Sequence, residues 1–333
     1  MTPEAFAYFL DVGQGDCSLI IAPSGDKILV DCADVTVALN VLKDSGICEL
    51  AAVVVSHLDL DHIRGMQRFL TTFLKNGGTI GRLFIDLDRP DILKNATGLL
   101  ELAIRLEREK KLRLGSAKRD VILEGSGWLI EFLSPLHGTR IDTSLRKREA
   151  PNLLSAVVRL QYAGQSVIIA GDAPLGAWEL IDPLERAARV FRAPHHGGDI
   201  GEGAKTLTID QFYLELAPDV SVFSVGTLND YPHPTAEHVR AAKSGRSCRR
   251  LCTQLTKQCH NDPDLKLKIA RLNTSKVGYD YRHHRKRSRP EVPCAGTVIV
   301  KIDHSGSINV VPNAGDWHDD FVKSLDRPLC LVP

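Results

Sequence analysis

The sequence predicts an α/β fold in which short apolar strands alternate with helices. Three observations support this prediction. Short apolar runs recur along the chain, as at residues 51–55 and 167–170, and such runs bounded by turns are typical of buried strands. Apolar residues at helical spacing follow one of these runs, at residues 63–74. Carboxylates and histidines stand directly after several runs, so that polar side chains gather at the ends of strands.

The predicted elements follow one another without an internal repeat or a clear linker. Strands are predicted at residues 5–10, 18–21, 27–30, 50–55, 82–85, 128–133, 156–160, 167–170, 190–193 and 220–225, with a final hairpin at 297–302 and 307–311. Helices are predicted at residues 36–43, 63–74, 96–111, 178–188 and 235–242. Residues 244–295 interrupt this pattern. We therefore expect one domain over residues 1–333, with a Cys/His-rich basic insertion over residues 244–295.

Length and composition exclude several classes of protein. A chain of 333 residues with 43% hydrophobic content can bury a substantial core. Its net charge of +1 means that nucleic-acid binding would have to come from local patches. No segment approaches the roughly 18 apolar residues of a membrane span, and the start of the chain lacks the pattern of a signal peptide. We expect a soluble, cytoplasmic protein without membrane contact, whose eight cysteines are free thiols or metal ligands.

The loop at residues 56–62 carries the densest set of metal-ligand side chains in the chain. It places His57, Asp59, Asp61 and His62 between a predicted buried strand and a predicted helix. Residues two apart in an extended segment face the same way, so His57 and Asp59 can face one point while Asp61 and His62 face another. Nitrogen and oxygen ligands at two neighbouring points suit two metal ions. The alternative is a solvated polar loop in which Asp61 only favours the start of the helix.

Other strand ends carry weaker signals of the same kind. Asp31 and Asp172 each follow a predicted strand, and His195 and His196 follow another. His233 stands between two prolines after a further strand. Taken alone, each has an ordinary explanation: a turn, a pair of histidines at a helix end, or a rigid loop. Their common position at strand ends is what favours a single site.

The ordered set of motifs resembles the metallo-β-lactamase fold, in the branch typified by the hydrolase domain of ComEC-type competence proteins. The motifs that carry the resemblance are Asp11-Val12-Gly13-Gln14-Gly15-Asp16, Leu29-Val30-Asp31, residues 56–65, residues 152–155, Gly171-Asp172, Pro194-His195-His196-Gly197 and Tyr231-Pro232-His233-Pro234. The resemblance covers residues 5–243 and resumes at residues 295–311. It implies an αββα sandwich with a metal site along one edge, at strand ends.

The resemblance also implies a set of ligands for two divalent metal ions. They are His57 and Asp59 for one metal, Asp61 and His62 for the other, Asp172 as the bridge, and His196 as the last ligand. The chain departs from the commoner pattern at two positions. Asp59 stands where many members have a histidine, and Asn152 stands near the position of a further ligand histidine. These departures leave the first metal with fewer protein ligands, and the additional oxygen makes Mn²⁺ an alternative to Zn²⁺.

Catalytic and substrate-contacting roles follow from the same resemblance. Asp61 would be both a metal ligand and a catalytic residue, and water held between the metals would supply a hydroxide nucleophile. His195 and His233 are the candidates to donate a proton to the leaving group. Arg64 is a candidate phosphate contact, and Asp31 would orient a ligand histidine.

The insertion offers a second group of metal-ligand residues. Cys252, Cys259 and Cys294, with either His260 or Cys248, are predicted to form a structural zinc site separate from the catalytic pair. The alternative is that these cysteines are free buried thiols.

A dense basic run within the insertion bears on the substrate. Residues 281–289 contain five Arg or Lys, among them Arg285, Lys286 and Arg287, a density that favours contact with a polyanion over a merely solvated loop. The leading prediction is a metal-dependent phosphodiesterase that acts on nucleic acid, with DNA favoured. One alternative is a hydrolase of a small phosphodiester, ester or amide, since fold does not fix substrate. Another is a zinc-stabilised interaction module with a degenerate metal site.

Overall fold

Two mixed β-sheets form the centre of the computed structural model, which describes residues 2–86, 93–136, 151–243, 248–259 and 291–331. The first sheet has the strand order β15-β14-β1-β2-β3-β4-β5-β6, and the second has the order β13-β12-β11-β10-β9-β8-β7. The strands of the first sheet are β1 (Ala5–Phe9), β2 (Ser18–Ile21), β3 (Lys27–Val30), β4 (Glu49–Val54), β5 (Thr79–Phe84), β6 (Arg113–Gly115), β14 (Val298–Ile302) and β15 (Ile308–Val311). Those of the second are β7 (Val121–Gly125), β8 (Trp128–Ser134), β9 (Val157–Tyr162), β10 (Gln165–Ile169), β11 (Val190–Arg192), β12 (Val220–Phe223) and β13 (Arg249–Cys252).

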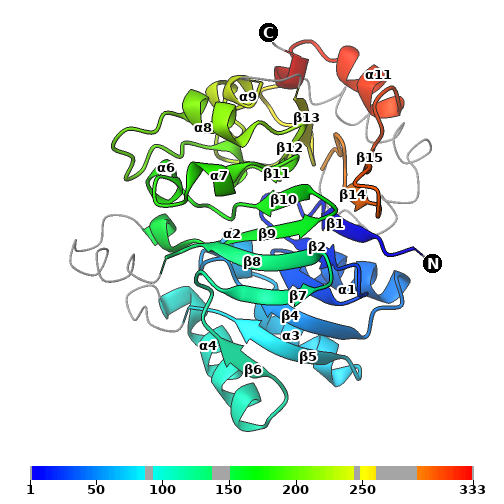
Figure 1. Ribbon diagram of the computed structural model, residues 1–333, viewed down its shortest axis with the longest axis vertical. Coiled ribbons are helices and arrows are strands. Elements are labelled where there is room, and N and C mark those ends of the chain that lie inside the picture. The colour runs from blue at the N-terminus through cyan, green and yellow to red at the C-terminus, as the bar shows by residue number, and fades with distance from the viewer. Residues whose placement is uncertain (1, 87–92, 137–150, 244–247, 260–290, 332–333) are drawn as a thin grey trace.

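Helices cover the outer face of each sheet. Those beside the first sheet are α1 (Val35–Asp44), α2 (Leu60–Ile63), α3 (Met66–Lys75) and α4 (Leu93–Arg108). Those beside the second are α6 (Leu175–Trp178), α7 (Pro183–Arg186), α8 (Ile209–Leu216), α9 (Ala236–Ala241) and α11 (Trp317–Lys323), with the short 3-10 turns η2 (Pro151–Leu154), η3 (Pro194–Gly197) and η5 (Leu329–Leu331). In Figure 1, α1, α3 and α4 lie in the lower part of the molecule, and α6, α7, α8 and α9 lie at the upper left, with the strands between the two groups.

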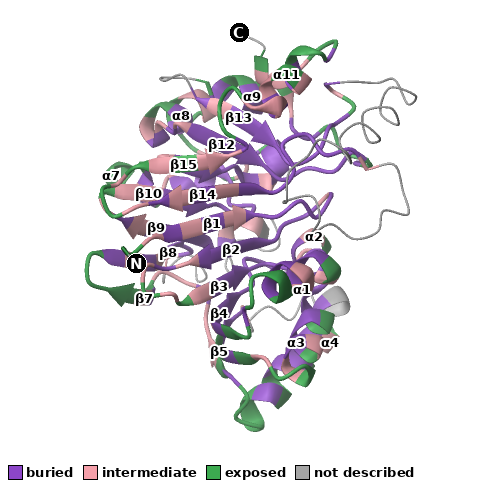
Figure 2. Ribbon diagram, turned by 90° about the vertical axis from the view of Figure 1, so that its right-hand side faces the viewer, coloured by how far each residue is buried: buried purple, intermediate pink, exposed green. Residues whose placement is uncertain are grey.

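Three hydrophobic cores separate these layers. One joins α1, α3 and α4 to the first sheet and includes Phe69. The second lies between the two sheets and includes Phe9 and Phe132. The third joins the second sheet to its helices and includes Phe191 and Phe212. Four layers with three apolar interfaces are the αββα sandwich that the sequence predicts, and that prediction is confirmed. In Figure 2 the central strands are therefore largely buried, whereas exposed residues concentrate on helices and outer turns.

The direction of the strands decides where the loops after them meet. Strands β3, β4 and β5 run parallel to one another, and so do β10, β11, β12 and β13. The carboxyl ends of parallel strands lie at the same edge of a sheet, which is where ligands bind in open α/β sheets. The loop after β4 carries α2, and Figure 2 shows α2 at the ends of the central strands.

The predicted helix over residues 178–188 is wrong, because the structure divides this region into α6 and α7. Pro183 occupies the first turn of α7, and the Asp182 side chain caps it by accepting a hydrogen bond from Leu184 N at 2.9 Å. A capped start with proline in the first turn begins a new helix rather than continuing an old one. The helices α8 and α11 were not predicted from the sequence.

The start of the predicted insertion is part of the second sheet. Strand β13 lies within residues 244–295 and pairs in parallel with β12. Further along, Gln254 forms an isolated antiparallel bridge with Pro293, which brings the two described ends of the insertion together. The final hairpin is confirmed as β14 and β15, and β14 pairs with β1, so the last strands of the first sheet lie beside its first. Among the described residues, no helix has the length and apolarity needed to cross a membrane.

Candidate metal centre

Loops after three strands supply the polar side chains of the centre. The loop after β4 carries His57, Asp59 and the short helix α2, the loop after β10 carries Asp172, and η3 follows β11. The Ser56 carbonyl accepts a hydrogen bond from Ala156 N at 2.9 Å, which fixes the first of these loops against the second sheet. The centre is therefore assembled from both sheets at one edge of the sandwich.

Four of the predicted ligands form a tight group. One ligand atom from each of Asp61, His62, Asp172 and His196 lies within 4.8 Å of the others. His62 Nε2 is 3.1 Å from Asp172 Oδ1, and His196 Nε2 is 3.0 Å from Asp61 Oδ2. His62, Asp172 and His196 are buried, whereas Asp61 is partly exposed. Two imidazoles and two carboxylates that converge in this way are a suitable set of ligands for a divalent cation.

The other two predicted ligands lie on the opposite side of Asp172. His57 Nε2 is 3.5 Å from Asp172 Oδ2 and 3.6 Å from Asp59 Oδ2. The two oxygens of Asp172 thus face two different histidines, His57 and His62, whose ring centroids are 4.0 Å apart. This half of the centre is more open, because the Asp59 side chain is 46% exposed.

Three histidines are anchored to the protein through Nδ1 and direct Nε2 towards the carboxylates. His57 Nδ1 lies 3.1 Å from Ser56 Oγ, His62 Nδ1 lies 2.7 Å from Asp31 Oδ2, and His196 Nδ1 donates to the Ser224 carbonyl at 2.9 Å. A hydrogen bond at one ring nitrogen fixes the tautomer and leaves the other nitrogen to bind metal. Among the described residues, His57 Nε2 and His62 Nε2 are buried without a hydrogen-bond partner, as is Asp172 Oδ1. Buried polar atoms of this kind require a partner, and a cation between them fits.

The charges in the centre support the same interpretation. Burial by itself would raise the pKa of the Asp172 carboxyl, but the neighbouring His62 and His57 hold it well below its usual range. Burial opposes protonation of His57, and the Asp172 carboxylate outweighs it and raises the pKa of His57 to about 9. A buried carboxylate that draws protons onto adjacent histidines is a site that favours positive charge. Divalent metal ions would supply that charge in place of the protons.

Asp31 lies behind His62 and holds its ring in place. It accepts hydrogen bonds from Ser56 N at 2.7 Å and Ser56 Oγ at 2.6 Å, in addition to its contact with His62 Nδ1. Its φ of 59° places the backbone in the left-handed region, which aspartate adopts more readily than most residues. A carboxylate bonded to a ligand histidine is the usual outer partner in metal sites.

Asp16 and Arg192 belong to the centre, and the sequence reasoning gave them no role. Asp16 Oδ2 is 3.5 Å from His62 Nδ1, and its Oδ1 is 3.5 Å from His196 Nδ1. The Arg192 guanidinium contacts the Asp16 carboxylate and donates to the Gly171 carbonyl at 3.0 Å. Arg192 is fully buried, and burial lowers its pKa to about 9. The available signal was an arginine inside the apolar strand β11, since arginine is rarely fully buried unless paired.

The segment from Pro194 to Gly198 turns sharply to bring His196 inward. His195 and His196 have φ values of 52° and 54°, a left-handed conformation that L-residues adopt only at a cost of about 1–2 kcal/mol each. Hydrogen bonds from His195 N to the Gly171 carbonyl (3.2 Å) and from Gly198 N to the His195 carbonyl (2.7 Å) hold this turn. A Cβ on Gly198 would lie 2.4 Å from His233 Nε2, so only glycine fits there.

His195 and His233 lie at the mouth of the centre, with ring centroids 5.2 Å apart. His195 is partly exposed, and its Nδ1 donates to the Asp199 carbonyl at 2.7 Å. His233 is 8% exposed, and burial lowers its pKa to about 4, which keeps the ring neutral at pH 7. Tyr231 is 65% exposed and stacks on His233, with centroids 5.5 Å apart and planes inclined by 20°.

Other predicted residues lie outside this group or outside the described residues. Arg64 is exposed, and its guanidinium donates to the Ala33 and Gln14 carbonyls, both at 3.3 Å. Asn152 lies in η2, and its buried Oδ1 has no hydrogen-bond partner in the described part of the chain. Outside the described residues lie His260, Arg285, Lys286 and Arg287.

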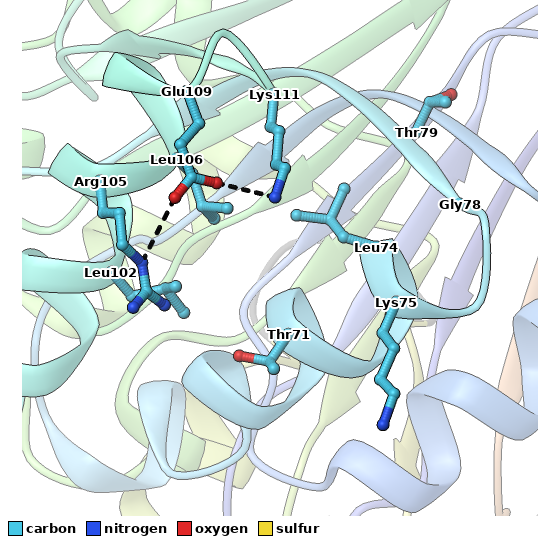
Figure 3. A pocket seen from close by; sticks show the side chains of 10 residues that line it. All are labelled: Thr71, Leu74, Lys75, Gly78, Thr79, Leu102, Arg105, Leu106, Glu109 and Lys111. Carbon is cyan, nitrogen blue, oxygen red and sulfur yellow. Dashed lines mark ion pairs between the residues drawn. The ribbon is translucent and has the colours of Figure 1, made fainter.

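A large cavity lies far from these ligands. It has a volume of about 600 Å³ and is formed by α3, the second half of α4 and the segments after them. Figure 3 shows Glu109 at its wall, paired with Arg105 at 4.0 Å and with Lys111 at 2.7 Å. None of the predicted metal ligands lines it. Glu109 thus partly neutralises Arg105, in the last turns of α4, and Lys111, just after that helix.

Comparisons with known proteins agree with this fold. The model of the metallo-β-lactamase superfamily matches residues 10–80. ComE operon protein 3 of Bacillus subtilis (strain 168) is 24% identical over 261 residues. That match covers 70% of this chain and 30% of the relative, so the chain spans under a third of the relative's length.

Three solved structures are similar to this chain at low identity. One is a diphosphatase of the PhnP family, with a TM-score of 0.40, 14% identity, and coverage of 67% of this chain and 87% of that one. Another is a mutant of the CmlA β-hydroxylase, with a TM-score of 0.43, 15% identity, and coverage of 75% and 53%. Human tRNase Z, short form, has a TM-score of 0.41, 13% identity, and coverage of 76% and 93%. Residues 10–80 thus match the metallo-β-lactamase superfamily, the chain has distant homology to ComE operon protein 3, and its His/Asp cluster is that of a metal hydrolase of this fold.

Proposed function

We propose that this chain is a phosphodiesterase that hydrolyses nucleic acid, with DNA favoured, and that it uses two divalent metal ions, Zn²⁺ or Mn²⁺. The observation that carries the proposal is the position of Asp172. Its two oxygens lie 3.1 Å from His62 Nε2 and 3.5 Å from His57 Nε2, at the junction of two groups of ligands. A carboxylate at such a junction offsets the mutual repulsion of two cations.

The ligands would divide around Asp172. His57 and Asp59 would hold one cation, and the tight group that contains His62 and His196 would hold the other. Divalent ions bound by these residues would supply a more acidic water, with its pKa lowered from about 15.7 towards about 7, and positive charge to stabilise a phosphate displacement. The chain itself then has to orient the phosphodiester and protonate the leaving oxygen.

His195 is the residue that we assign to proton donation. It stands at the mouth of the centre, and its Nδ1 is held by the Asp199 carbonyl, which leaves Nε2 for the substrate. His233 is less suited to this step, because its pKa of about 4 keeps it neutral at pH 7. A general acid has to carry its proton at the working pH.

Tyr231 supports nucleic acid as the substrate. Its exposed ring stacks on His233, and His233 lies nearly parallel to His196, with centroids 6.3 Å apart and planes inclined by 21°. A row of aromatic rings thus leads from the metal centre to the surface. Stacking of a base on an exposed aromatic side chain contributes about 1–3 kcal/mol per base and does not depend on sequence.

A small phosphodiester is the second candidate substrate. The observation that favours it is the engagement of Arg64, whose guanidinium bonds to two backbone carbonyls instead of reaching towards a nucleic-acid backbone. The two candidates differ in what they require outside the metal centre. A small phosphodiester needs only the metals and His195, whereas a nucleic acid also uses Tyr231.

The test compares wild-type protein with Asp172→Asn, after loading with Zn²⁺ or Mn²⁺, on a bis-aryl phosphodiester, single- and double-stranded DNA, and RNA. We expect Asp172→Asn to lose at least a hundredfold in turnover on every substrate that the wild type cleaves, because an amide cannot balance two cations. The control is Asp320→Asn, an exposed aspartate of α11 that should keep full turnover. Near-wild-type turnover by Asp172→Asn with full metal content would refute the assigned bridge. Cleavage of the aryl phosphodiester without cleavage of DNA or RNA would establish the second candidate.

A further inference from the structure

Four cysteines from distant parts of the chain come together in one part of the core. Cys252 ends β13, Cys259 lies in the segment after it, Cys294 precedes β14, and Cys330 lies in η5. Cys252, Cys259 and Cys294 are buried in the core between the second sheet and its helices, and Cys330 packs against that core. In the described part of the chain these sulfurs are not joined in disulfides.

Backbone hydrogen bonds fix the segments that carry these thiols. Cys294 N donates to the Thr253 carbonyl at 3.0 Å, and Ala295 N donates to the Cys252 carbonyl at 2.8 Å. Cys259 N donates to the Thr256 carbonyl at 3.2 Å. The approach of the cysteines is therefore a feature of the fold, although their separations along the sequence do not form a short zinc-binding motif.

The thiols also influence one another's charge. Burial raises the pKa of each of them, and a negative charge on one raises the pKa of another in every pair that the four can form. Four thiols that are mutually close and buried cannot all ionise without a cation among them. A zinc ion reverses this balance, because it binds thiolates and deprotonates them outright.

His318 and Arg250 lie beside this group. His318 is buried, its Nε2 is 3.6 Å from Cys294 Sγ, and its Nδ1 is 3.4 Å from Asp319 Oδ1. The positive charge of Arg250 opposes the effect of burial on Cys252. A cationic side chain near a thiolate cluster offsets the excess negative charge that four sulfurs give to a zinc site.

We propose that Cys252, Cys259, Cys294 and Cys330 bind a structural zinc ion, with the His318 imidazole in contact with the Cys294 sulfur. The proposal does not depend on the proposed function. It changes the ligand set expected from the sequence. Cys248 Sγ lies against Ser221 Oγ at 3.4 Å, and we place Cys330 of the C-terminal segment in the fourth position instead.

Zinc binding requires the four cysteine sulfurs to lie closer to one another than they do in this structure. Tetrahedral Zn–S bonds of about 2.3 Å place the sulfurs roughly 3.8 Å apart. No three of these described thiols converge within 4.8 Å, so at least one of them has to change its rotamer. A change of χ1 between staggered positions moves a cysteine sulfur by roughly 3 Å.

The site would fasten the edge of the second sheet to the C-terminal segment. It lies next to Gln254, whose side chain donates to Asp11 Oδ1 at 2.6 Å and accepts from Thr227 N at 2.8 Å. Thr227 and Asp11 belong to loops that follow β12 and β1, at the same edge as the metal centre. Loss of the zinc should therefore loosen the surroundings of the metal centre without removing its ligands.

The experiment measures zinc in the full chain and in two cysteine variants. Cys259→Ser removes one proposed ligand, and Cys48→Ser is the matched control, because Cys48 is exposed and lies far from the group in the first half of the chain. We expect Cys259→Ser to carry one zinc equivalent fewer than the wild type, and Cys48→Ser to carry the same amount. With cobalt in place of zinc, the wild type and Cys48→Ser should show a thiolate-to-cobalt charge-transfer band that Cys259→Ser lacks, since the His/Asp centre has no thiolate ligand.

A second measurement covers the case in which Cys259→Ser does not fold. Titration of the native wild type with an organomercurial should release one zinc ion as four thiols react. Asp172→Asn should release the same zinc, which separates this site from the catalytic one. Unchanged zinc and an unchanged cobalt band in folded Cys259→Ser would overturn the proposal, and so would mercurial reaction of these thiols without zinc release.

Discussion

Asp31→Asn tests whether the carboxylate behind His62 controls metal binding. Asp31 is fully buried, and its two oxygens accept from Ser56 N, Ser56 Oγ and His62 Nδ1 at 2.6–2.7 Å. Asparagine has the same shape but replaces one oxygen with an NH₂ group. Since all three partners are donors to the carboxylate, that NH₂ group has to face a donor. Either the Ser56 hydrogen bonds or the orientation of His62 must therefore be lost.

The size of the effect follows from these contacts. Removal of the outer partner of a ligand histidine typically weakens metal affinity by about 10- to 100-fold, which corresponds to about 1.4–2.7 kcal/mol. A hydrogen bond to a charged group contributes about 1.5–3 kcal/mol, so the metal-free protein should also lose stability of that order. Competition with a chelator measures the first quantity, and urea unfolding of the metal-free protein measures the second.

A nearby aspartate provides the control. Asp34 caps α1 by accepting from Thr36 N at 2.8 Å, and asparagine caps helices about as well as aspartate. Asp34→Asn should therefore bind metal like the wild type. If Asp31→Asn also bound metal within twofold of the wild type, Asp31 would not orient His62 in a way that matters for binding.

Two further predictions concern buried charges around the centre. Arg192→Met should destabilise the protein by about 3–5 kcal/mol in urea unfolding, because it leaves the buried Asp16 carboxylate unpaired. Adding Asp16→Asn to the same chain should recover part of this loss. Equal stability of the single and the double variant would contradict the pairing. His238 is fully buried between the Gly198 carbonyl and Tyr213 OH, and burial lowers its pKa to about 4. The unfolded chain then binds more protons than the folded one between about pH 4 and 6.5, so stability falls as the pH falls through this window. In His238→Gln the loss between pH 7 and 5 should be smaller by about 2 kcal/mol, and an identical pH dependence would show that His238 does not contribute.

The sequence predicts the sandwich well because its strands are short apolar runs that end in recognisable polar motifs. It fails where tertiary contacts decide the structure. Strand β13 lies in a segment rich in arginine and cysteine, and it is a strand because it pairs with β12 and so becomes the edge of the second sheet. The predicted helix over residues 178–188 fails for a different, local reason, because Pro183 and its Asp182 cap begin a new helix and outweigh apolar spacing.

Residues behind the ligands were harder to predict than residues in the motif. Arg192 and Asp16 are 176 positions apart, and no local pattern connects them. Asp16 lies in a glycine-rich turn that was recognised as a motif, but its role becomes visible only when η3 brings His196 within 3.5 Å of it. The cysteine group shows the same effect, since Cys330 is brought to Cys252 by the C-terminal segment after β15.

The central motif itself shows where a rule of local geometry stops applying. The prediction that residues two apart face one point holds for His57 and Asp59, which lie 3.6 Å apart in the extended segment before α2. The rule for extended segments ends at Leu60, where α2 begins and successive residues point about 100° apart, but one ligand atom of Asp61 and one of His62 still lie within 4.8 Å of each other. His62 is fully buried against Asp172 and Asp31, whereas Asp61 remains partly exposed and reaches His196 instead. The group of Asp61 and His62 is therefore completed by Asp172 and His196, which follow strands of the second sheet. This group converges more closely than His57 and Asp59, which both come from one loop.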